Sequence, residues 1–141
     1  MGLTSVDPPM SDYSALTRGV RVAVTPQFLE DQSDPTRNTY VWAYHVEITN
    51  EGHTTVQLTA RHWTIIDKHG QTQTVKGPGV VGEQPILREG DSFLYTSACP
   101  LSTPSGLMMG TYVMQTEDGE TFDAQIPAFS LDSPYEEQRV N

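Results

Sequence analysis

The chain has 141 residues, of which 36% are hydrophobic and 18% are charged, and this length predicts one domain with a single core. Eighteen acidic residues against eight basic ones give a formal net charge of −10, which disfavours binding to double-stranded nucleic acid because the phosphates would be repelled. The sequence holds no membrane-spanning apolar run and no secretion signal, and its single cysteine, Cys99, excludes an internal disulfide. We therefore expect a cytoplasmic protein that does not associate with membranes.

Proline, serine and aspartate without periodicity mark the two ends of the chain. Residues 1–17 are expected to form a flexible N-terminal arm, and residues 136–141 a C-terminal tail. Residues 18–135 are expected to form one β-sandwich domain.

Between these ends, apolar side chains recur at every second residue, which is typical of half-buried β-strands. A first strand is predicted around residues 20–25, and the longest alternation, over residues 40–49, predicts a central strand. Asp118-Gly119 between two alternating segments predicts a hairpin. Further strands are expected over residues 72–76, 92–98, 108–116 and 121–128.

The strand that follows the central one changes its pattern. Leu58 and Trp63 fall on opposite parities, so an uninterrupted strand would point one of them away from the core. We expect a β-bulge near Arg61-His62 to bring both inside.

Seven or eight short strands, with no amphipathic helical stripe, predict an all-β fold. The expected architecture is a two-sheet antiparallel β-sandwich of the immunoglobulin or fibronectin type III kind. Open sheet edges leave a homodimer as an open alternative.

The segment from Lys76 to Gly82 contains the spacing G-x-G-x-x-G, formed by Gly77, Gly79 and Gly82. In dinucleotide-binding folds such glycines open a helix whose amides hold pyrophosphate, but Pro85 disfavours a following helix here. The favoured interpretation is a glycine-rich connection between strands. The alternative is a phosphate site made of backbone amides and helped by Lys76.

No combination of residues indicates catalysis or a metal site. His62 and the other three histidines are scattered, and Cys99 has no neighbouring base in the sequence. Glu117-Asp118 falls in a predicted turn, and the methionines suit core filling. We expect a protein without enzymatic activity, cofactor or metal.

Several spaced segments together resemble the bacterial ApaG family over about residues 18–135. Because these segments agree in order, the resemblance is specific. They are residues 44–50, 61–65, 75–85, 93–97, 106–110 and 126–131, with Leu58, Asp67, Gly70, Gly90, Tyr112 and Phe122 between them.

The resemblance implies a fibronectin type III-like sandwich. Similar domains occur in an F-box subunit of ubiquitin ligases and in a DNA polymerase delta-interacting protein, which implies an interaction module. The bacterial members share a gene neighbourhood with a diadenosine tetraphosphate hydrolase and are associated with cobalt and magnesium handling. Our leading hypothesis is a non-enzymatic module that binds a protein or peptide. The alternative is a binder of pyrophosphate- or nucleotide-type ligands through Lys76, Gly77, Gly79 and Gly82.

Overall fold

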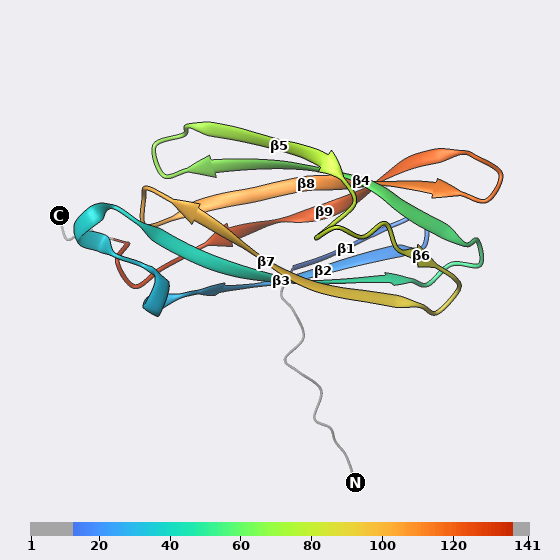
Figure 1. Ribbon diagram of the computed structural model, residues 1–141, viewed down its shortest axis with the longest axis horizontal. Coiled ribbons are helices and arrows are strands. Elements are labelled where there is room, and N and C mark those ends of the chain that lie inside the picture. The colour runs from blue at the N-terminus through green and yellow to red at the C-terminus, as the bar shows by residue number, and fades with distance from the viewer. Residues whose placement is uncertain (1–12, 137–141) are drawn as a thin grey trace, which may run out of the picture.

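The computed structural model describes residues 13–136, and nearly all of them belong to strands or to the turns between strands (Figure 1). Two short 3₁₀ helices, Glu30–Gln32 and Pro35–Arg37, interrupt the connection between the second and third strands. Across the described residues, no helix is long and apolar enough to span a membrane. The strands are β1 (Tyr13–Thr17), β2 (Val20–Phe28), β3 (Tyr40–Asn50), β4 (Val56–Asp67), β5 (Thr72–Pro78), β6 (Ile86–Leu87), β7 (Ser92–Leu101), β8 (Gly106–Thr116) and β9 (Thr121–Leu131).

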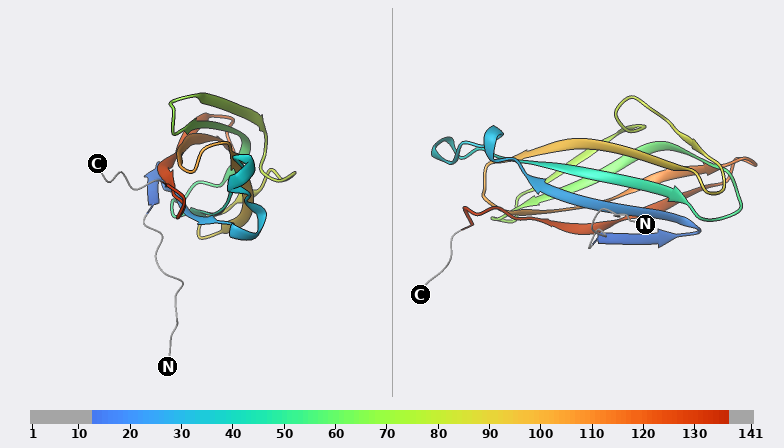
Figure 2. Two further views of the ribbon diagram at one scale, coloured as in Figure 1. Left: turned by 90° about the vertical axis from the view of Figure 1, so that its left-hand side faces the viewer. Right: turned by 90° about the horizontal axis from the view of Figure 1, so that it is seen from below.

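The strands form two antiparallel sheets that enclose one core, which confirms the predicted β-sandwich. The first sheet has the order β1-β2-β3-β7, and β7 and β1 lie on its opposite edges (Figure 2, right). The second sheet has the order β5-β4-β8-β9, and β6 adds a short pairing to β4. Viewed along the long axis of the molecule, the two sheets surround the core (Figure 2, left).

Strand β3 shows how the sequence pattern produces the core. The alternate residues Tyr40 to Ile48 are all buried, whereas His45 and Glu47 between them are exposed. Successive side chains of a strand point to opposite faces, so the aromatic and aliphatic set faces the second sheet. Among the most completely buried side chains are Trp42, Tyr112 and Phe129.

The predicted bulge in β4 is present, slightly nearer the N-terminus than expected. The register against β8 shifts between Leu58 and Ala60 rather than at Arg61-His62. As a result Leu58 and Trp63 are both buried, although they have opposite parities. A second register shift, between β8 and β9 at Met108 and Gly110, was not predicted.

The ordered sandwich begins earlier than the sequence pattern suggested. Residues 13–17, which we assigned to the N-terminal arm, form strand β1 and pair with β2. The segment is short and its apolar residues do not alternate, because Ala15 and Leu16 are adjacent and Leu16 is exposed, so the pattern gives no strand signal. The remainder of the predicted arm, residues 1–12, and residues 137–141 of the predicted tail lie outside the described residues.

The two long sides of the sandwich differ. On one side, β1 and β2 pack against β9, and two side chains of β1 reach across to β9. On the other side, β5 and β7 are the edges, and no comparable packing joins them within residues 13–136. We call these the closed side and the open side.

Candidate functional site

A groove runs along the open side between β5 and β7. It consists of two adjoining depressions of about 350 and 220 Å³, which share Ile65, Gln73 and Pro100. The groove exists because the edge strands do not meet and because β7 presents the small inward side chains Ser97 and Cys99. The other lining residues are Tyr44, Arg61, Trp63, Asp67, Gln71, Thr72, Val75, Ala98, Leu101, Ser102 and Met108.

Aromatic rings form the floor of the groove. Tyr44 from β3 and Trp63 from β4 meet edge to face, with ring centroids 5.2 Å apart. Trp63 also contacts Tyr112 and Phe129 deeper in the core. Such contacts restrict the motion of the floor, since Trp63 packs against Tyr44 of the opposite sheet and against Tyr112 and Phe129 of its own sheet.

Phenol hydroxyls lie close beneath this floor. The hydroxyls of Tyr95 and Tyr112 are hydrogen-bonded to each other across the two sheets. Burial raises the pKa of both phenols well above its ordinary value, and burial also raises the pKa of Tyr44, partly offset by a hydrogen bond to Ser97. All three phenols are therefore neutral at physiological pH and act as hydrogen-bonding groups rather than bases.

Cys99 lies inside β7 rather than at a strand end, because β7 continues to Leu101. Its side chain is buried, and burial raises the pKa of the thiol to about 11. The thiol is therefore protonated at neutral pH, which removes the nucleophilic form that catalysis requires. The geometry fits the interpretation of Cys99 as a small apolar residue.

Arg61 stands at one end of the groove and is half-buried. Its Nη1 donates hydrogen bonds to the carbonyl oxygens of Pro78 and Gly79, each at 2.9 Å. The guanidinium lies against Gly77, where a Cβ atom would stand 3.0 Å from Nη2. Gly77 therefore lacks a side chain for a packing reason, because the guanidinium occupies that space.

The second half of the glycine motif forms a tight turn rather than a helix start. Val81 and Gly82 have φ values of 43° and 82°, and the amides of Val80 and Glu83 donate to each other's carbonyl oxygens at 2.8 Å. The Gly79 amide donates to Thr59 O at 2.9 Å. This is the geometry of a strand connection, the interpretation that the sequence favoured.

The four residues proposed as a phosphate site are thus distributed over a strand and a turn. Lys76 and Gly77 belong to β5, whereas Gly79 and Gly82 belong to the turn. The Lys76 side chain is exposed and, by strand alternation, faces away from the groove. The structure therefore brings Gly77 and Gly79 together with Arg61, a residue that the sequence analysis left without a role.

The histidines are dispersed over the surface, as their positions in the sequence suggested. His45 is hydrogen-bonded to Gln27 and Thr96, and His53 pairs with Glu89. Within residues 13–136, no group of three histidine, cysteine or acidic side chains is arranged to hold a metal ion.

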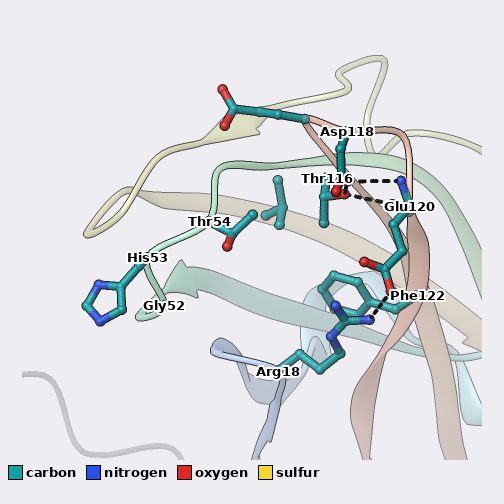
Figure 3. A pocket seen from close by; sticks show the side chains of 10 residues that line it. Arg18, Gly52, His53, Thr54, Thr116, Asp118, Glu120 and Phe122 are labelled. Atoms are coloured by element: carbon teal, nitrogen blue, oxygen red, sulfur yellow. Dashed lines mark hydrogen bonds and ion pairs between the residues drawn. The ribbon is translucent and has the colours of Figure 1, made fainter.

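A larger pocket of about 530 Å³ lies at one end of the sandwich, where the turns after β1, β3 and β8 meet (Figure 3). The guanidinium of Arg18 lies 4.5 Å from the centre of the Phe122 ring and pairs with Glu120 at 3.2 Å. Asp118 accepts a hydrogen bond from the Thr116 hydroxyl, which lowers the pKa of this carboxyl. Figure 3 shows His53 pointing away from these groups. Arg18 and Glu120 are paired with each other in this pocket, as are Thr116 and Asp118.

Comparison with known proteins agrees with the fold. The family model described as the ApaG domain matches residues 30–116. The chain is 60% identical to Protein ApaG of Paramagnetospirillum magneticum and 57% identical to Protein ApaG of Rhodospirillum centenum, each over 92% of this chain and 99% of the relative.

The solved structures extend this agreement to three dimensions. The crystal structure of the ApaA protein from Bordetella pertussis superposes with a TM-score of 0.80 at 45% identity, and covers 90% of this chain and 99% of its own. The C-terminal domain of wzt, at 12% identity and a TM-score of 0.52, shares the fold alone. The chain belongs to the ApaG family.

Proposed function

We propose that this protein is a non-enzymatic binding module of the cytoplasm, and that it accepts an extended polypeptide segment in the groove on its open side. The main observation behind this proposal is that the two sides of the sandwich are covered differently. The closed side is covered by β1, whereas β7 pairs only with β3 among the described strands. An edge strand next to a preformed groove suits the addition of a partner strand, which pairs its backbone with the edge and places alternate side chains in the groove.

The composition of β7 supports this proposal. Exposed edge strands usually carry charged residues that prevent unwanted pairing, but Ser92–Leu101 contains none. Leu94 on its outer face is 68% exposed. The segment before Pro100 is therefore chemically suited to pairing with another chain, whereas Pro100 itself has no amide to donate.

The absence of enzymatic activity is part of the proposal. The phenols and the thiol at the groove are neutral at pH 7, so they supply no base and no activated nucleophile. The groove resembles a binding site more than a reaction centre, because an aromatic floor lies beside a few charged and polar groups that could orient a ligand.

The alternative function is the binding of pyrophosphate- or nucleotide-type ligands by Lys76, Gly77, Gly79 and Gly82. It is supported by two nearby bases, Arg61 of β4 and Lys76 of β5, but their side chains point to opposite faces of the sheet. It is less well supported by the turn, because the amides of Gly79, Val80 and Glu83 already donate to backbone carbonyls. A thermal-shift series with pyrophosphate and diadenosine polyphosphates tests it, with Lys76→Gln as the variant that should lose the shift.

The experiment on the leading proposal begins with selection of binders from a library of random peptides of about ten residues, the length of a long strand. The affinity of a selected peptide is then measured for the wild type and two variants. Gln73→Trp should abolish binding, because Gln73 is exposed and lines both parts of the groove. Thr74→Trp is the matched control, since Thr74 is equally exposed on the other face of β5. Equal loss in both variants, or in neither, would contradict the proposal.

A further inference from the structure

Among the arginines and lysines of residues 13–136, Arg21 and Arg61 are half-buried, and of these two Arg61 has no carboxylate partner. Arg18, Arg21, Arg37 and Lys68 each lie within 3.5 Å of an acidic side chain. Arg61, in contrast, forms no ion pair with any residue in the described range 13–136, although the chain has 18 acidic residues. A charge that is partly removed from water is normally paired.

The hydrogen bonds of Arg61 leave its charge uncompensated. Both acceptors of Nη1 are neutral carbonyl oxygens, those of Pro78 and Gly79. Within the described part of the chain, Nε and Nη2 have no hydrogen-bond acceptor of their own. Because two hydrogen bonds fix the guanidinium, its remaining donors are held in place before any ligand arrives.

The depression of the groove that Arg61 lines contains no acidic residue. In the depression that Arg61 lines, it is the one charged residue, and the neighbouring polar side chains are Tyr44, Ser97 and Gln73. Asp67 lines the far depression, but its Oδ1 already accepts from the amides of His69 and Gln71 at 2.9 Å. In a chain with net charge −10, the depression at Arg61 is thus a local positive site.

We propose that the segment bound in the groove is acidic, and that one of its carboxylates is held by the free donors of Arg61 beside the hydroxyls of Tyr44 and Ser97. This inference rests on the proposed function and specifies the chemistry of the partner. Guanidinium donors suit a carboxylate because the resulting hydrogen bonds are charge-assisted and can be formed in pairs.

The shape of the groove favours a polypeptide over a small free anion. The depression at Arg61 continues past Ile65, Gln73 and Pro100 into the second depression, so the surface follows the edges of the sandwich. A small anion would contact one end only. An extended chain would contact both depressions and could pair with β7 at the same time.

The test uses a peptide selected on the wild-type protein and a twin in which its glutamate or aspartate residues are replaced by glutamine or asparagine. For the wild type we expect the acidic peptide to bind at least about tenfold more tightly than its twin, the effect of one charge-assisted hydrogen bond. In Arg61→Gln the two peptides should bind equally. Arg61→Lys should restore part of the preference, because the charge remains while the forked geometry is lost. Arg88→Gln is the control, since Arg88 is an exposed base outside the groove.

The outcomes separate this inference from the proposed function. If Gln73→Trp blocks the selected peptides but the twin binds equally well, the groove binds peptides and the acidic preference is wrong. If no selected peptide is blocked by Gln73→Trp, both proposals are wrong. Pyrophosphate is added as a competitor, and displacement of the peptide at micromolar pyrophosphate would assign Arg61 to phosphate instead. Melting curves of both Arg61 variants establish that a loss of preference occurs in folded protein.

Discussion

The closed and open sides of this sandwich are both bordered by β-strands, but the edges of these strands are covered on the closed side only. On the closed side, the hydroxyl of Thr17 accepts a hydrogen bond from the Gln125 amide, and the hydroxyl of Tyr13 accepts one from the Ser130 amide. Side chains of β1 thereby occupy backbone donors of the β9 edge. On the open side, small residues of β7 face a groove instead. The fold therefore protects the edge on its closed side and leaves the edge on its open side available to a partner.

The largest expected effect comes from the core that joins both sides. Phe129 is fully buried and its ring contacts those of Tyr13, Tyr44 and Trp63. Phe129→Ala should lower the free energy of unfolding by about 3–5 kcal/mol, because a large cavity would remain. Urea denaturation measures this, and a loss below about 1 kcal/mol would show that the core can collapse around the site.

The turn that follows β5 offers a sharper comparison. Gly79 has a φ of 60°, and a Cβ atom there would lie 2.2 Å from the carbonyl oxygen of Glu83. Gly79→Ala should therefore cost more than about 2 kcal/mol, from left-handed strain together with displacement of the turn. Gly82→Ala is the matched control, because Gly82 also has a positive φ but open space around its Cα. Equal losses in thermal denaturation would contradict the role given to the contact with Glu83.

Alkaline pH should lower the free energy of unfolding through Cys99, whose thiol lies at the open side. Burial raises the pKa of this thiol from 9.0 to about 11, so the unfolded chain releases its proton first as the pH increases. Stability should fall between about pH 9 and pH 11, by on the order of 2 kcal/mol, and this contribution is fully present below pH 9. Burial also raises the pKa of the Tyr44, Tyr95 and Tyr112 phenols, so they ionise at lower pH in the unfolded chain and add to the loss of stability. The contribution of Cys99 is therefore the difference between the wild type and Cys99→Ala. Parallel pH profiles for the two proteins would contradict this assignment.

The smallest effect concerns the protection of the closed side. Thr17→Val removes the acceptor of the Gln125 amide, whose hydrogen bond is 3.1 Å long, while retaining a similar volume. We expect a loss of about 1 kcal/mol and faster hydrogen exchange at Gln125. Exchange in β7 should be unchanged. Slower or unaltered exchange at Gln125 would mean that β1 does not protect the β9 edge.

The sequence pattern was sufficient for the parts of the fold that rest on local alternation. It predicted the buried face of β3 and the hairpin at Asp118-Gly119, where Gly119 has a φ of 89°. It also predicted a bulge in β4, because Leu58 and Trp63 have opposite parities and both had to point into the core. These features depend on neighbours in sequence, so the sequence alone reveals them.

The candidate site depends instead on residues that meet only after folding. The groove exists because β5 and β7, which are edge strands of different sheets, do not meet. Arg61 belongs to it because it lies two residues before Trp63, after the bulge, so both side chains point to the inward face of β4. The sequence did contain one indication of this site, because Arg61 has the same inward parity as Trp63 although it is charged. The role of Arg61 became clear only from the folded position of Gly77, whose lack of a side chain leaves room for the guanidinium.

Hydrogen exchange at the two edges, measured with and without a peptide selected on the protein, tests the account most directly. We predict that the bound peptide slows amide exchange in β7, between Ser92 and Leu101, and leaves the turn at residues 117–120 unchanged. Protection confined to the end pocket around Arg18 and Glu120, or to the turn at Gly79–Gly82, would contradict the assignment of the open side as the binding face.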